Sequence, residues 1–178
     1  MDIQEKINNY LNEGTKAFPF KKDHSTIHEL SYSFKNDDGE EYFLTAEYVK
    51  VENEVFARNY QDDGMYWVME NITDIDEYYS ISFTQDKKIV NYKLSDDPYS
   101  NQVMATVISI IQTILKKKKV KVIRMTNWEN CMDNLYEKLI KWLSSKIKFK
   151  TAHTYTFRGR KKYVLWDGKK IKIERKMR

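Results

Sequence analysis

The sequence has little glycine, proline and cysteine for its length. Of 178 residues, five are glycine, two are proline and one is cysteine. The single cysteine, Cys131, excludes an internal disulfide and favours a reducing compartment, where a packed thiol is expected. No glycine lies between positions 65 and 158, so this stretch has no glycine-rich loop that would bring backbone amides close to a phosphate.

Long apolar runs and metal-ligand clusters are also missing. No segment approaches the roughly 20 apolar residues of a membrane span, and the first residues do not resemble a signal peptide. We therefore expect no membrane association. His24 and His28 have helical metal-ligand spacing, but they fall where a loop is predicted to enter a strand, and His153 is the only other histidine. A metal site is not expected.

The residues that are abundant indicate one folded domain spanning residues 1–178. The chain is 41% hydrophobic and 14% aromatic, which is enough for a core. Charge is strongly polarised: residues 1–110 carry 10 Lys/Arg and 21 Asp/Glu, whereas residues 111–178 carry 21 Lys/Arg and 5 Asp/Glu. The two parts either neutralise each other across contacts or form a dipolar surface that steers partners.

The N-terminal part, residues 1–95, has the pattern of a short helix followed by antiparallel strands. Apolar spacing predicts a helix over 2–13 that ends at Gly14. Alternation at Leu30, Tyr32 and Phe34, with turn residues 36–39, predicts a hairpin. The predicted strands of this part form a meander and cover residues 30–34, 42–49, 55–59, 65–69, 78–84 and 89–94.

The remaining part, residues 96–178, has a helix–strand–helix pattern followed by a basic β-hairpin. A buried helix is predicted to begin with Asp97 as N-cap and Pro98 as first helical residue, and to end in the lysines 116–119. A strand at 120–125, a helix opened by the capping box Thr126–Glu129, and strands at 153–157, 162–166 and 170–175 follow. The predicted class is α+β, with a mixed, mostly antiparallel sheet, two main helices and the short N-terminal helix.

This order of elements resembles the GCN5-related N-acetyltransferase (GNAT) fold over residues 78–166. The closest local match is Leu135-Tyr136-Glu137-Lys138-Leu139, and the stretch Ala105-Thr106-Val107-Ile108-Ser109-Ile110-Ile111 is similar to small uncharacterised phage-encoded GNAT-like proteins. The resemblance implies that Tyr136 protonates the departing thiolate of coenzyme A, for which a phenol is a suitable acid. The alternative is that Tyr136 only packs on the buried face of its helix.

The sequence departs from the family where the cofactor binds. The family places a glycine-containing pyrophosphate loop before its long helix, but residues 95–102 contain no glycine, and Pro98 lacks an amide donor. Asp96 and Asp97 would face the phosphates. We therefore predict no cofactor, with acetyl-CoA required only if the chain is catalytic.

The basic C-terminus is the strongest binding signal outside the resemblance. Cations hold phosphates and aromatic faces stack bases, as in single-strand binding; the alternative is that the same aromatics face the core. An acidic protein partner, including the acidic part of another copy, fits the charge equally well. The candidate binding residues are Arg158, Arg160, Lys161, Lys162, Lys169, Lys170 and Lys172, interleaved with Tyr155, Phe157, Tyr163 and Trp166.

Three hypotheses of function follow from these observations. The first is a phage-type GNAT-like protein without catalysis, a structural or protein-binding module that is virion-associated or host-directed and associates with a partner or itself through opposite charges. It would be found in the host cytoplasm or the virion. The second is an acetyl-CoA-dependent N-acetyltransferase, and the third is nucleic-acid binding through the basic C-terminus.

Overall fold

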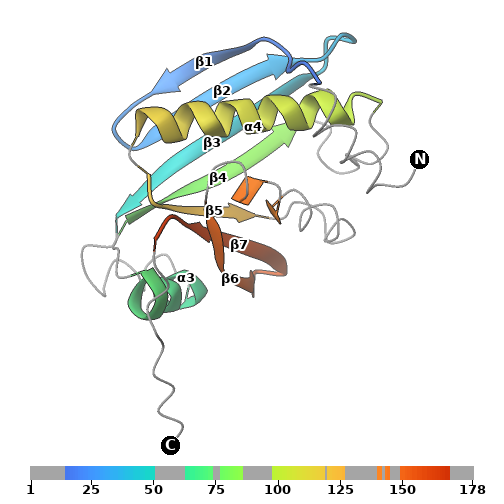
Figure 1. Cartoon of the computed structure of the whole chain (residues 1–178). Helices are drawn as coiled ribbons and strands as arrows, with labels where there is room; N and C mark the ends of the chain where they lie inside the picture. The colour runs from blue at the N-terminus through green and yellow to red at the C-terminus, as the bar shows by residue number, and fades with distance from the viewer. Residues whose placement is uncertain are drawn as a thin grey trace, which may run out of the picture. The chain divides into compact units, whose positions relative to one another are not determined.

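The protein combines a seven-stranded sheet with helices. The computed structural model describes residues 15–50, 63–73, 77–85, 98–118, 120–126, 140–141, 143–144 and 149–168. In chain order the elements are β1 (Phe20–Ser25), β2 (Glu29–Lys35), β3 (Glu41–Lys50), α3 (Asp63–Val68), the π-helical turn η1 (Met69–Thr73), β4 (Glu77–Gln85), α4 (Ser100–Lys117), β5 (Val122–Thr126), β6 (Lys150–Phe157) and β7 (Arg160–Trp166) (Figure 1).

The strand order confirms the predicted fold class. The sheet runs β1-β2-β3-β4-β5-β7-β6, and the pairs β1–β2, β2–β3, β5–β7 and β6–β7 are antiparallel. Antiparallel strands, then the long helix α4, then β5 and a closing hairpin form the GNAT-like order that the sequence predicts. The fold is therefore α+β and GNAT-like.

Several predicted elements lie outside the described residues. They are the helix at 2–13, the strands at 55–59, 89–94 and 170–175, and most of the helix after Thr126, including Cys131 and Tyr136. Of that last helix, residues 140–141 and 143–144 are described and helical. Ile140 and Leu143 are buried, as expected of its apolar stripe.

The chain divides into two compact units, each built from two segments. Unit 1 comprises Met1–Glu47 and Ile81–Lys119, and unit 2 comprises Tyr48–Ser80 and Val120–Arg178. The prediction of a single domain over residues 1–178 stays a prediction. Each unit has its own buried side chains and is described by itself.

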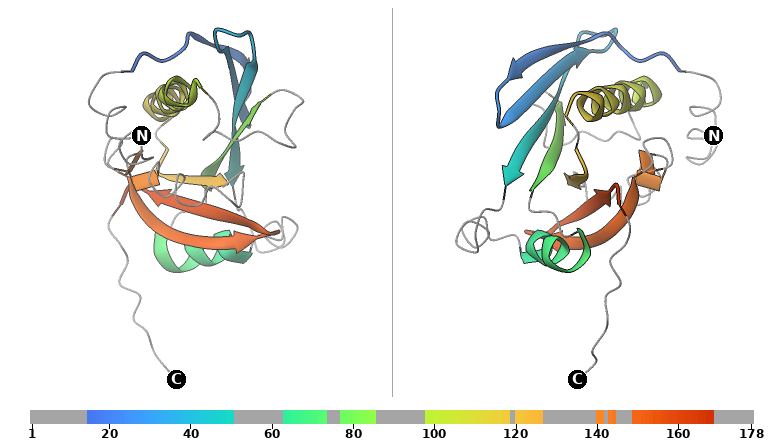
Figure 2. Two further views of the ribbon diagram at one scale, coloured as in Figure 1. Left: turned by 90° about the vertical axis from the view of Figure 1, so that its right-hand side faces the viewer. Right: turned by 60° about the vertical axis from the view of Figure 1, so that its left-hand side comes forward.

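Unit 1 contains the alternating hairpin β2–β3 and the helix α4, which crosses one face of strands β1 to β3 (Figure 2). Leu30, Tyr32 and Phe34 are buried, as their alternation predicts. The Phe34 and Tyr42 rings, on directly paired residues, stack with centroids 4.9 Å apart. Gly39 turns the hairpin with a φ of 81°.

The helix α4 is buried along the face that the sequence predicts, but it begins later than expected. Val103, Ile110, Ile111 and Ile114 are fully buried. The prediction that Asp97 caps the helix and Pro98 opens it is wrong: the N-cap is Tyr99, which makes no side-chain capping bond. The backbone amide of Phe18 instead donates to Thr106 Oγ1 at 2.9 Å, which ties α4 to the chain before β1.

Two elements of the structure differ from the sequence prediction. Strand β1 was not predicted, because five of its six residues are exposed and only Phe20 is apolar. The predicted strand at 65–69 is wrong, since these residues belong to α3 and η1. Met65, Val68 and Met69 are buried at helical spacing i, i+3 and i+4, a signal that the apolar run concealed.

Unit 2 packs α3 and η1 against one face of strands β5, β7 and β6. Its core cluster takes side chains from the end of β3, from α3, η1 and β4, and from the sheet. Ala152 and Tyr155 of β6 pack against this cluster. The members of the cluster are Val49, Met65, Val68, Met69, Tyr78, Val122, Val164 and Trp166.

Candidate functional site

The hairpin β6–β7 is closed by a two-residue turn of Arg158 and Gly159. Phe157 pairs with Arg160, and both turn residues have positive φ, 50° for Arg158 and 71° for Gly159. Two successive positive φ values are characteristic of a type I′ turn, whose twist matches that of the strands it joins. Glycine adopts this conformation freely, whereas an arginine there is unusual, because its Cβ crowds the following carbonyl oxygen.

Strand register places aromatic and basic side chains on one face of this hairpin. Thr126, Lys162 and Tyr155 form one row across β5, β7 and β6, and Arg160 pairs with Phe157 in the next row towards the turn. Side chains two residues apart on a strand share a face. We call Tyr155, Phe157, Arg158, Arg160 and Lys162 the basic hairpin face.

The strands that carry this face have charges of one sign only. Strands β5, β6 and β7 and the turn between the last two contain no aspartate or glutamate. A surface that bears only cations attracts anions and repels cations over about 10 Å at moderate salt. The cations of these elements are Arg124, Lys150, Arg158, Arg160, Lys161 and Lys162.

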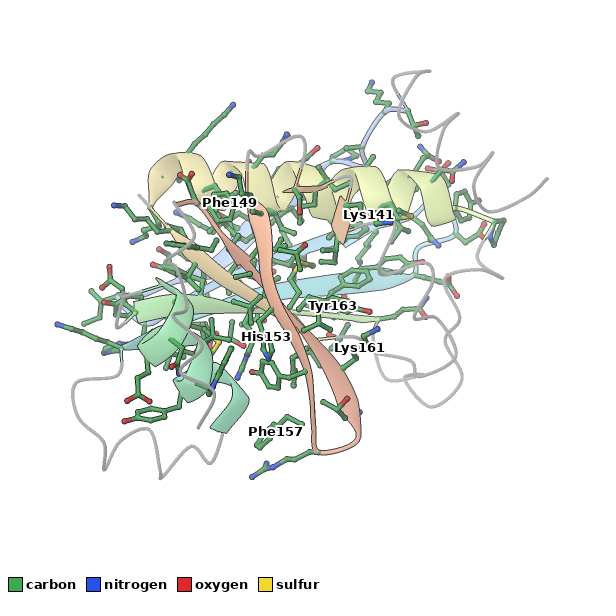
Figure 3. The ribbon with its side chains drawn as sticks, turned by 60° about the horizontal axis from the view of Figure 1, so that its bottom comes forward. Lys141, Phe149, His153, Phe157, Lys161 and Tyr163 are labelled. Carbon is green, nitrogen blue, oxygen red and sulfur yellow. The ribbon has the colours of Figure 1, made fainter. Side chains whose placement is uncertain are left out.

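Several of these cations are held in place by neighbouring side chains. Lys162 Nζ donates to Thr126 Oγ1 at 2.8 Å, and Arg158 lies 5.2 Å from the centroid of the Phe157 ring. Lys161 points to the opposite face, 5.6 Å from the Tyr163 ring centroid (Figure 3). Arg158 and Arg160 are exposed, whereas Lys161 and Lys162 are half-buried. The two arginines are thus the most accessible cations at the turn.

The aromatic residues of the hairpin are mostly turned inward. Tyr163 and Trp166 are buried, at 2% and 6% exposed, which agrees with the alternative that the aromatic side chains of this segment face the core. Tyr155 lies against α3, where a Cβ added to Gly64 would come within 2.3 Å of its ring. The Phe157 ring is approached by Arg158. The hairpin strands therefore present cations, and few of their aromatic faces remain accessible for stacking.

An exposed tryptophan on α3 adjoins the same hairpin, and it was not singled out from the sequence. Trp67 is 41% exposed, and its ring centroid lies 4.8 Å from that of His153 on β6. His153 is in turn stacked on Tyr155, at 6.0 Å and 19° between planes. Burial lowers the pKa of His153 below its ordinary value, which favours the neutral form of the ring.

The other sequence-predicted site residues are not brought together by the described structure. Tyr136, Lys169, Lys170 and Lys172 lie outside the described residues. His24 lies in β1 and His28 in the turn before β2. In the described ranges no group of three or more His, Cys, Asp or Glu side chains is arranged to hold a metal ion.

The start of α4 does not fit the pyrophosphate group of coenzyme A. The described part of this segment has Pro98, which lacks an amide hydrogen, and Tyr99 as N-cap. The Tyr99 ring is packed edge-on against Phe18, with centroids 5.9 Å apart. No catalytic step through a cofactor is derived for this site, and the absence of a cofactor stays a prediction.

Comparisons with known proteins give a distant structural likeness. No protein-family model and no curated protein sequence matches this chain. Among solved structures it is similar to FeeM, an N-acyl amino acid synthase from uncultured soil microbes. The identity is 11%, the TM-score is 0.44, and the match covers 92% of this chain and 88% of that chain. A likeness of this size says nothing about activity, and the fold class stands on the strand order.

The structure bears on membrane insertion in one respect. Among the described helices, none combines the length and the apolar character needed to cross a bilayer. The predicted location in a host cytoplasm or a virion stays a prediction.

Proposed function

We propose that the protein binds nucleic acid through the basic hairpin face. The observation on which this rests is that β5, β6, β7 and their turn carry six cations and no carboxylate, with Arg158, Arg160 and Lys162 in the basic hairpin face. Phosphate contacts of this kind provide affinity that does not depend on base sequence.

The geometry favours a phosphate backbone as the ligand of these cations. Arg158 and Arg160 flank Gly159 at the tip of a hairpin, exposed and close together. A guanidinium presents several donors in a fixed plane, which suits phosphate oxygens. Lys162 is one row beyond Arg160 on the same face, so these two cations follow the direction of β7 and, together with Arg158 at the turn, match an extended polyanion.

The experiment measures how affinity for a fluorescein-labelled oligothymidylate changes with salt, by fluorescence anisotropy. Each phosphate contact to a single strand adds about −0.7 to the slope of log K against log salt. The variant Arg158→Asn/Arg160→Gln should therefore weaken binding and flatten the slope by about 1.4. Asparagine is chosen at 158 because it tolerates positive φ.

A matched control removes the same charge elsewhere. Lys116→Gln/Lys117→Gln changes two exposed cations at the end of α4, in unit 1. This variant should keep the parent slope to within about 0.3, because those side chains contact no phosphate in the proposal. A parent affinity that does not vary with salt, or equal losses in both variants, would refute the proposal.

The other two hypotheses of function rest mainly on the sequence. A binding module without catalysis is the class to which the proposal belongs, but neither the described residues nor the comparisons support a phage or virion role. Acyl transfer depends on Tyr136 and the loop before α4, which lie wholly or partly outside the described residues. Both stay predictions from sequence.

A further inference from the structure

The exposed ring of Trp67 is the feature of unit 2 that the phosphate contacts leave unexplained. Trp67 and Ile27 are the large hydrophobic side chains that are exposed among the described residues, and Ile27 lies in a hairpin turn of unit 1. Its neighbours Met65 and Val68 on the same short helix are buried in the core cluster. Core packing therefore does not require an indole at position 67.

The ring is supported from behind by neutral aromatic groups. The Trp67 and His153 centroids are 4.8 Å apart, and His153 stacks on Tyr155, whose ring is fixed against Gly64. These rings form a ladder from the surface to the core of unit 2. A supported, half-exposed indole is a flat surface that loses little conformational freedom when a second flat ring stacks on it.

This ladder lies beside the basic hairpin face. His153 and Phe157 are on the same strand, and four residues of a strand span about 13 Å. Figure 3 shows His153 beside α3 and Phe157 near the turn of the hairpin. A ligand held by Arg158 and Arg160 would therefore need only a short extension along β6 to reach the indole. One exposed carboxylate, Glu70, follows Trp67 by three residues on the helix and would repel a phosphate there.

We infer that Trp67 stacks a nucleobase of the bound strand and so gives the site its preference for single-stranded over double-stranded nucleic acid. This inference rests on the proposed function. Bases of a single strand expose their faces, whereas those of a duplex are stacked on one another. Cations alone bind single strands and duplexes alike, so the indole beside them is the group that favours single strands.

The test compares single-strand and duplex affinities in two variants of Trp67. Oligothymidylate and a duplex of equal length are titrated against the parent, Trp67→Ala and Trp67→Phe at one salt concentration. Trp67→Ala should lower single-strand affinity between about 5-fold and 100-fold, the range for one lost base stack. Trp67→Phe keeps a flat ring and should lose less. Duplex affinity should stay within about 2-fold in both variants, because phosphate contacts alone provide it.

The outcomes separate this inference from the function on which it rests. Unchanged single-strand affinity in Trp67→Ala would overturn the stacking role and leave the phosphate contacts standing. Equal loss on both ligands would also overturn it, since the residue would then act through folding. No salt-dependent binding of either ligand by the parent would overturn both proposals. As a further check, Glu70→Gln should strengthen single-strand binding, and a loss of affinity in that variant would contradict the placement of the strand over α3.

Discussion

Replacing Gly64 by alanine sets two opposing effects against each other in unit 2. Gly64 lies in α3, where alanine favours the helix by up to about 1 kcal/mol relative to glycine. A Cβ at this position, however, would lie 2.3 Å from Cδ2, 2.6 Å from Cε2 and 2.7 Å from Cγ of Tyr155. Ordinary contacts begin at 3.4 Å, so the ring would have to move by about 1 Å.

The steric effect should dominate. Rotation of the Tyr155 ring about χ2 leaves Cγ in place, and rotation about χ1 would take the ring out of its contacts with the core cluster and with His153. Overpacking of this kind costs about 1–3 kcal/mol. After subtraction of the helix propensity, Gly64→Ala should lower the free energy of unfolding by about 1 kcal/mol.

The assay is urea unfolding followed by far-ultraviolet circular dichroism, with Tyr155→Ala as the second background. Without the Tyr155 ring the clash is gone, and Gly64→Ala should then stabilise the protein by up to about 1 kcal/mol. The double-mutant cycle should give a coupling of about 2 kcal/mol. An effect of the same sign in both backgrounds would refute the close approach of α3 to β6.

Three further predictions concern other parts of the chain. Thr106→Val should lower the free energy of unfolding by about 1–3 kcal/mol in the urea assay, because it leaves the buried amide of Phe18 without its acceptor. The control Thr113→Val loses only a hydrogen bond to its own helix and should be nearly neutral. Gly159→Ala should lower the free energy of unfolding by about 1–2 kcal/mol in thermal unfolding, because φ at this position is 71°. An added Cβ meets nothing within 4 Å, so the cost comes from the backbone conformation and not from a clash. Gly159→Asn should lower it less, and equal losses in the two variants would contradict the turn conformation. Burial lowers the pKa of His153 below 6.5, so the folded state binds fewer protons than the unfolded state. The stability that this group contributes is complete above pH 6.5 and is lost as the pH falls through the folded pKa. His153→Gln should remove that part of the pH dependence of unfolding.

The sequence predicts best those elements whose two faces differ in polarity. Apolar and polar residues alternate along most of β2 and β3, and α4 has a broad apolar face, so all three were predicted close to their observed bounds. β1 is an edge strand that contains charged residues, which protect the edge but remove the apolar alternation. Residues 65–69 form a short apolar run that fits a buried strand as well as a helix, and only the wider packing decides between them.

The candidate site was predictable in charge and not in shape. The cations at 158, 160 and 162 are evident in the sequence, and strand alternation gives the shared face of Arg160 and Lys162. The contribution of Trp67 depends on α3 being a helix and on its contact with β6, both of which are tertiary facts. The missed local signal was the spacing of Met65, Val68 and Met69, which would have left Trp67 on the outer side of a helix.

The interleaving of the two units has a consequence for the order in which the protein can fold during synthesis. Chain segments pass from one unit to the other inside β3, inside β4 and again after Lys119. The first unit has all its residues once position 119 has left the ribosome, whereas the second must hold residues 48–80 without their partners until β7 emerges. A prematurely terminated chain that stops before Trp166 would therefore expose the apolar side of α3. A single proteolytic cut after Lys119 would leave all of unit 1 in one fragment but divide unit 2 between two.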